Sequence, residues 1–279
     1  MTRRRSEHRK PAREFGIGLA RAFGGAIFFA LPLFMTMEMW QLGFHMDRLR
    51  LAIFLAVFIP VLIGLSHYAG FEETDRWSDD VRDCFVALLV GFATSAAVLT
   101  LGGVVQLEMP LRETLGQIAL AAIPASVGAA LAESVLGSEE PSEQRKRREM
   151  GYGGELFLMA AGAIFFAFNI APTEEMVLVA VKMTGWHIVA AGVISLLLMH
   201  AFVYAVEFRG RHVPPEGVGM WSLFLRFTVV GYAIALIMSA YVLWTFGRLD
   251  HSSLPFQIAT TIVLAFPASL GAAAARLVL

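Results

Sequence analysis

The chain has 279 residues, of which 57% are hydrophobic and only 16% are charged. Soluble domains carry about 25% charged residues, which cover their surface. The low charged fraction and the mean hydropathy of +0.65 together exclude a soluble protein of this size. The single cysteine, Cys84, excludes an intramolecular disulfide framework and a cysteine-cluster metal site. The composition therefore predicts a polytopic membrane protein.

Apolar stretches long enough to cross a bilayer follow one another along the whole chain. A crossing helix needs about 20 mostly apolar residues, and the eight stretches of that length are 17–42, 49–70, 84–105, 114–136, 156–181, 187–208, 222–246 and 255–277. The first is too long for a cleavable signal peptide and contains Glu38. The predicted fold is all-α, with eight transmembrane helices.

The basic residues predict how the chain is oriented. They gather in a tail at 1–16 and in the loops after the fourth and sixth stretches: Arg3, Arg4, Arg5, Arg9, Lys10, Arg13, Arg145, Lys146, Arg147, Arg148, Arg209 and Arg211. Cytoplasmic loops of membrane proteins are enriched in Lys and Arg. Both termini and the polar linker 137–155 are therefore expected in the cytoplasm.

The two halves of the chain, 17–136 and 156–279, resemble each other. The run GAIFFA occurs at Gly25–Ala30 and again at Gly162–Ala167, and PASVGAA at Pro124–Ala130 is matched by PASLGAA at Pro267–Ala273. We therefore expect two four-helix repeats. Because four crossings return the chain to its starting side, the repeats would be parallel, related by a pseudo-two-fold axis along the membrane normal.

The same repeat position carries acidic residues in both halves. Glu38 falls in the first stretch, and Glu174 and Glu175 fall at the matching level of the fifth. A carboxylate inside the hydrocarbon costs at least about 2.5–3.5 kcal/mol and marks a candidate functional site. The alternative is that these glutamates reach the outer interface and are solvated there.

Prolines beside these glutamates predict broken helices. Pro32 precedes Glu38, and Pro172, expected in the first turn of a new half-helix, precedes Thr173. A break frees backbone carbonyls, whose oxygens together with carboxylates suit Ca²⁺, Na⁺ or Mg²⁺. The predicted ion site consists of Glu38, Glu174, Glu175, Thr36, Thr173 and Asn169, with Glu38 and Glu175 as the metal ligands. The alternative for each proline is a packing kink.

Two short runs resemble ion-binding sequences of known families. TMEMW at Thr36–Trp40 resembles the Thr-x-Glu-x-Trp filter of voltage-gated calcium and sodium channels. NIAPTEE at Asn169–Glu175 is similar to the Asn-x-Pro-Glu runs of cation/calcium exchangers. Each resemblance covers a handful of residues; the chain has no arginine-rich voltage sensor, and exchanger repeats are inverted. The two resemblances imply that carboxylates of this chain bind a cation.

A wider resemblance covers nearly the whole chain. Its length, eight stretches, basic amino terminus and FxxPLxxTMEMW run at Phe29–Trp40 resemble a family of uncharacterised bacterial integral membrane proteins. This resemblance implies a location in the bacterial inner membrane and implies no activity.

Other polar residues have structural explanations as well as functional ones. His67 and His200 suit proton coupling or hydrogen-bonded packing. Arg226 is expected to reach the interface or to pair with an acid. The acidic loop 71–83 is either a solvated loop or a weak cation site, and it lacks the pattern of a calcium-binding loop.

Three function classes remain open from the sequence. The preferred one is a cation channel or transporter, with calcium or sodium as the bound ion. A non-transporting structural or signalling protein is the second, and a membrane-embedded enzyme is the third, although no catalytic constellation supports it; we expect no enzyme activity and no organic cofactor. The expected partners are the lipid bilayer and an inorganic cation and not nucleic acid, with a homo-oligomer left open.

Overall fold

The computed structural model describes residues 9–69, 77–106, 108–132, 151–204 and 220–278, and these form helices and no strand. Most of the basic tail, residues 137–150 with the basic cluster of the expected linker 137–155, the loop residues 71–76, and Arg209 and Arg211 lie outside the described residues, whereas residues 152–155 of that linker belong to a helix. The contacts divide the chain into two compact units, of which unit 1 comprises 1–44 and 55–148 and unit 2 comprises 45–54 and 149–279.

Unit 1 is built around α6. Its helices are α2 (Arg9–Phe34), α3 (Met37–His45), most of α4 (Arg48–Ala69), α5 (Trp77–Leu101) and α6 (Leu111–Ala130). Both α2 and α5 pack on α6, in which every residue from Ala119 to Ala130 is buried. The small side chains of α6 allow this close packing, which membrane helices use in place of large apolar contacts.

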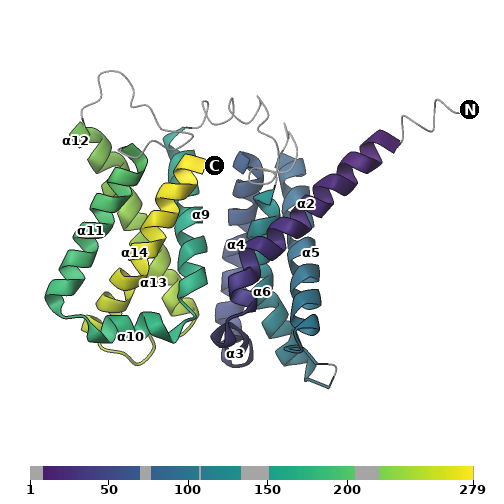
Figure 1. Cartoon of the computed structure of the whole chain (residues 1–279), viewed down its shortest axis with the longest axis horizontal. Helices are drawn as coiled ribbons and strands as arrows, with labels where there is room; N and C mark the ends of the chain where they lie inside the picture. Colours follow the sequence, from purple (N-terminus) through teal and green to yellow (C-terminus); the bar gives the residue numbers. More distant parts are fainter. Residues whose placement is uncertain (1–8, 70–76, 107, 133–150, 205–219, 279) are drawn as a thin grey trace, which may run out of the picture. The chain divides into compact units, whose positions relative to one another are not determined.

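Unit 2 is built around α14. Its helices are α9 (Tyr152–Ile170), α10 (Glu174–Lys182), α11 (Gly185–Tyr204), α12 (Met220–Leu223), the π-helix η1 (Phe224–Val229), α13 (Val230–Thr245) and α14 (Leu254–Val278). Helices α9, α10, α11 and α13 all pack on α14. Figure 1 shows α10 running across one end of this unit, at a steep angle to α9 and α11.

A pair of glycines brings two helices together in each unit. In unit 1 a Cβ added to Gly25 of α2 would lie 2.4 Å from the carbonyl oxygen of Gly128 in α6. In unit 2 a Cβ added to Gly162 of α9 would lie 2.2 Å from the carbonyl oxygen of Gly271 in α14. The matching runs of the sequence therefore make the same kind of contact inside each unit.

Seven described helices are long and apolar enough to cross a membrane: Gly16–Phe34, Arg48–Tyr68, Trp77–Leu101, Tyr152–Ile170, Gly185–Phe202, Trp221–Thr245 and Leu254–Leu277. They correspond to seven of the eight expected stretches. The remaining stretch, 114–136, corresponds to α6, where Arg112, Glu113 and Gln117 interrupt the apolar sequence. The fold is that of a polytopic helical membrane protein.

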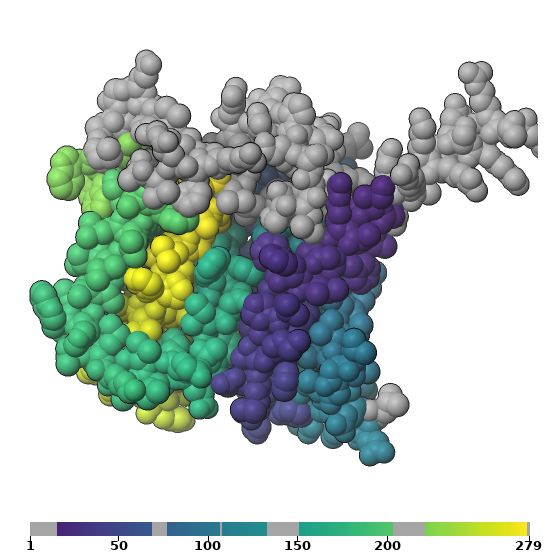
Figure 2. Space-filling view, in the orientation of Figure 1, coloured from purple at the N-terminus to yellow at the C-terminus, as the bar shows by residue number. Residues whose placement is uncertain are grey.

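Apolar side chains cover the outside of unit 2. Figure 2 shows α10 and α11 at the surface of this unit, and their exposed side chains include Leu178, Val181, Trp186, Val189, Val193 and Leu197. An exposed apolar surface of this kind suits the hydrocarbon tails of lipids. The surface agrees with the composition, which excludes a soluble protein.

Candidate functional site at the helix breaks

In unit 1 the predicted site lies at the break between α2 and α3. Pro32 lies inside α2, which ends two residues later at Phe34. The Thr36 hydroxyl donates to the Pro32 carbonyl at 2.6 Å, and the Trp40 indole donates to the Phe34 carbonyl at 2.9 Å. Glu38 is half-buried in the first turn of α3. The chain leaves the helix at Met35 and Thr36, within the expected stretch 17–42.

In unit 2 the break lies between α9 and α10. Thr173 is the N-cap of α10, so Pro172 precedes the helix instead of lying in its first turn as expected. The Thr173 hydroxyl donates to the Ile170 carbonyl at 2.8 Å. The Asn169 amide donates to the Phe165 carbonyl at 2.8 Å. A hydroxyl that donates to a carbonyl keeps its lone pairs, so Thr173 is still able to contribute an oxygen.

The three glutamates share one position in their helices. Glu38 lies in the first turn of α3, and Glu174 and Glu175 lie, both exposed, in the first turn of α10. Carboxylates there stabilise a helix by about 0.3–1 kcal/mol because the amino-terminal end carries partial positive charge. The positions thus have a structural role whether or not they bind an ion.

The described residues do not form a ready-made metal centre. No group of three or more His, Cys, Asp or Glu side chains in the described ranges is placed to hold a metal ion. Glu38 belongs to unit 1, whereas Glu174 and Glu175 belong to unit 2. Calcium takes 6–8 oxygen ligands in its protein sites, so the described side chains of each unit supply only part of such a shell.

Arg248 is a residue of the site that the sequence analysis did not single out. Its guanidinium Nη2 donates to the carbonyl oxygen of Pro172, which is one of the carbonyls at the break. Its Nε is buried and has no hydrogen-bond partner among the described residues. The break of unit 2 therefore already carries a positive charge that belongs to the protein.

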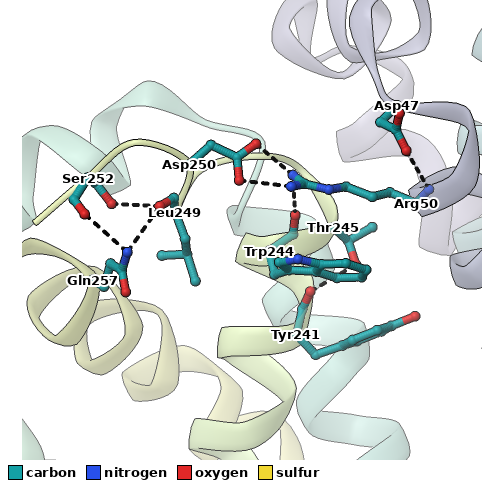
Figure 3. Close-up of polar contacts among 9 residues, drawn as sticks. All are labelled: Asp47, Arg50, Tyr241, Trp244, Thr245, Leu249, Asp250, Ser252 and Gln257. Atoms are coloured by element: carbon teal, nitrogen blue, oxygen red, sulfur yellow. Dashed lines mark hydrogen bonds and ion pairs between the residues drawn. The ribbon is translucent and has the colours of Figure 1, made fainter. Parts of the chain in front are cut away.

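The turn that carries Arg248 is held by a second arginine. Figure 3 shows Arg50, from the first turn of α4, donating to both carboxylate oxygens of Asp250 at 2.7 and 2.9 Å and to the Trp244 carbonyl at 2.9 Å. The guanidinium also lies 5.1 Å from the centre of the Trp244 ring. Such bidentate pairs are geometrically specific, so Arg50 fixes the end of α13 and the turn that follows.

Asp250 gives this turn a pH dependence. Its hydrogen bonds from Arg50 lower the pKa of Asp250 below its ordinary value of 3.8. A carboxyl with a lowered pKa stabilises the fold above the ordinary value, and this contribution is lost as the pH falls through the folded pKa. We expect Asp250→Asn to remove no more than about 1 kcal/mol at neutral pH, because the pair is partly exposed.

The measurement is the difference in melting temperature between wild type and Asp250→Asn in detergent. This difference should be largest near pH 6 and should shrink as the pH falls below the ordinary value of 3.8 and through the lowered folded pKa, since protonation then removes the same charge from the wild type. A difference that stays constant as the pH falls through this range would contradict the role assigned to Asp250.

A second polar cluster lies at the other end of α9. Arg276 Nε lies 2.8 Å from the Glu155 carboxylate, and the guanidinium lies 3.8 Å from the centre of the Phe227 ring. The Tyr152 hydroxyl donates to the Arg226 carbonyl at 2.8 Å. Arg226 lies over the Tyr152 ring at 5.3 Å. Because π-helices leave the regular i→i−4 pattern, the Tyr152 hydroxyl provides a donor for a carbonyl within η1.

The two histidines in candidate membrane spans, His67 and His200, have hydrogen-bonded partners. His200 Nδ1 lies 2.9 Å from the Thr228 hydroxyl. His67 Nδ1 lies 2.9 Å from the buried carboxylate of Asp80. These contacts agree with the packing alternative for both residues.

Comparison with known proteins bears on the class of the protein. Residues 18–279 match the family described as "Putative integral membrane protein (DUF2391)". The chain belongs to this family. No curated protein and no solved structure matches the chain. Membership agrees with the wider resemblance found from the sequence and assigns no activity to the DUF2391 chain.

Proposed function

We propose that this membrane protein moves cations across the bilayer, with Ca²⁺ or Na⁺ as the transported ion. The observation that carries the proposal is that both units have a broken helix followed by a nine-residue helix with carboxylates in its first turn. Glu38, Glu174 and Glu175 attract the ion, and backbone and hydroxyl oxygens at the breaks replace part of its water. A transported ion has to leave again, so a weak and incomplete site suits this role.

The proposal includes eight crossings in two parallel four-helix units. Helix α6 is the additional crossing, since its 20 residues span about 30 Å. The matched glycine contacts of α2 with α6 and of α9 with α14 support a duplicated unit. Both termini face the cytoplasm of a bacterial cell, and the protein lies in the inner membrane, because the basic clusters mark that side.

The alternative function is that of a structural or signalling protein, and one observation at the break of unit 2 favours it. Glu174 and Glu175 are exposed, and the carbonyl of Pro172 accepts a hydrogen bond from Arg248. This arrangement favours a structural or signalling protein without transport, in which the glutamates only stabilise α10. We propose neither enzyme activity nor an organic cofactor in either case.

Ion uptake into vesicles tests the proposal. The variant Glu38→Gln/Glu174→Gln/Glu175→Gln keeps the size of each side chain and removes the charge that attracts the cation. We expect uptake of Ca²⁺ or Na⁺ by vesicles containing the full chain to fall by about tenfold or more, which corresponds to about 1.4 kcal/mol of lost ion binding.

Glu113→Gln is the matched control, because Glu113 also lies in the first turn of its helix, α6, and is half-buried. Glu113→Gln removes the same kind of helix stabilisation and changes no residue of either break. Vesicles that contain this variant should therefore take up the ion as wild type does. If wild type carries neither ion, or if the triple variant carries them as well as Glu113→Gln does, the structural or signalling alternative replaces transport.

A further inference from the structure

The turn after α13 places Arg248 in a fixed position. The backbone N–H of Gly247 donates to the Trp244 carbonyl at 3.0 Å, and that of Arg248 donates to the Leu243 carbonyl at 2.9 Å. Gly247 has φ +70°, so these bonds form the Schellman motif that ends many helices. The residue at the position of Arg248 usually makes an apolar contact in this motif, whereas here it carries a charge.

The backbone on the carboxyl-terminal side of Arg248 is held as well. The Ser252 hydroxyl and the Gln257 amide both donate to the Leu249 carbonyl, at 2.8 and 3.2 Å (Figure 3). Together with the bonds from Arg50, these contacts leave the turn little freedom. This hydrogen-bonded turn therefore holds the backbone of Arg248 beside the break between α9 and α10.

The two breaks differ in the group that donates a hydrogen bond to their carbonyl. In unit 1 the Phe34 carbonyl accepts from the neutral indole of Trp40 at 2.9 Å. In unit 2 the Pro172 carbonyl accepts from the charged guanidinium of Arg248. Charged donors make stronger hydrogen bonds than neutral ones, and an arginine side chain stays charged throughout the physiological pH range.

Within the described part of the chain, no carboxylate is paired with Arg248 to neutralise it. No ion pair to Arg248 is present among the described residues, although Glu174 and Glu175 follow Pro172 closely in the chain. Its buried Nε also has no partner there. The positive charge thus remains at the carbonyl where a mobile cation would bind.

We propose that Arg248 is a tethered cation that occupies the break of unit 2 and makes the two ion sites unequal. This inference rests on the proposed transport function and deepens it. The mobile cation meets an uncharged break only in unit 1, beside Glu38. At unit 2 the guanidinium repels the ion, so Glu174 and Glu175 contribute fully only when this charge is removed.

Ion uptake by vesicles containing the full chain tests the inference with Arg248→Gln, which removes the charge and keeps a polar side chain. Uptake should rise by about fivefold, an effect in the range that one charge has at a partly exposed site. Arg248→Lys keeps the charge and should stay closer to wild type. Lys182→Gln removes one positive charge from the far end of α10 and should leave uptake unchanged.

The contribution of the unit 2 glutamates should depend on Arg248. In wild type, Glu174→Gln/Glu175→Gln should lower uptake less than Glu38→Gln does. In the Arg248→Gln background, the two changes should lower it by similar factors. Melting temperatures in detergent identify any variant that fails to fold.

The outcomes distinguish the tethered-cation proposal from the transport proposal. If Glu38→Gln lowers uptake but Arg248→Gln neither raises it nor increases the cost of Glu174→Gln/Glu175→Gln, the tethered cation is wrong and transport stands. If wild type shows no uptake, or Glu38→Gln has no effect, both proposals fall. If Arg248→Gln does not fold, a smaller loss from Glu174→Gln/Glu175→Gln than from Glu38→Gln in wild type supports the inference, and an equal or larger loss overturns it.

Discussion

Replacing Glu155 with glutamine is expected to lower the free energy of unfolding by about 3 kcal/mol, the lower end of the range for breaking a buried ion pair. The Arg276 side chain is only 2% exposed, and its Nε lies 2.8 Å from the Glu155 carboxylate. The variant removes the carboxylate charge that faces this buried guanidinium at the interface of α9 and α14. Desolvation of the guanidinium charge is then compensated less.

Thermal or chemical unfolding in detergent, followed by circular dichroism, provides the measurement. Glu113→Gln is again the matched control, because both glutamates lie in the first turn of a helix; it should cost less than about 1 kcal/mol. The double variant Glu155→Gln/Arg276→Met should recover most of the stability, since it removes both buried charges. Equal losses from Glu155→Gln and Glu113→Gln would show that the pair does not stabilise unit 2.

The sequence predicted the membrane helices well because their signal is local. Each of them is a run of apolar residues whose length is set by the bilayer, and seven of the expected stretches correspond to described helices that are long and apolar enough to cross a membrane. The break at Pro172 was also predictable, because proline, threonine and glutamate in succession start a helix. The extent of the break near Pro32 was not, since that proline lies inside α2.

The parts of the site that the sequence missed depend on contacts between distant residues. Arg50 and Asp250 are 200 positions apart, and Arg248 and Pro172 are 76 apart. No local pattern indicates which carbonyl a given arginine reaches. The hydrogen bond from the Trp40 indole to the Phe34 carbonyl also has no signal in the sequence. The π-helix η1 likewise has no local sequence signal that we recognise.

The glycine contact of unit 2 predicts a second large loss of stability. Gly162→Ala is expected to lower the free energy of unfolding by about 1–3 kcal/mol, because overpacked interfaces have to move apart. The new Cβ would lie 2.2 Å from the Gly271 carbonyl oxygen and 2.6 Å from the Ala275 Cβ. Neither neighbour is the flexible end of a long side chain, so the backbones of α9 and α14 would have to separate.

Gly153→Ala in the same helix separates this packing effect from helix propensity. A Cβ at Gly153 has nothing within 4 Å, so this variant should be neutral or more stable by up to about 1 kcal/mol. The corresponding pair in unit 1 is Gly25→Ala, whose Cβ would lie 2.4 Å from the Gly128 carbonyl oxygen, with Gly16→Ala as its control. If the units are duplicates, Gly25→Ala and Gly162→Ala should cost similar amounts because both interfaces close through the same pair of small residues. A stable Gly162→Ala protein would contradict the close contact of α9 with α14, and a loss confined to one unit would argue against a shared architecture.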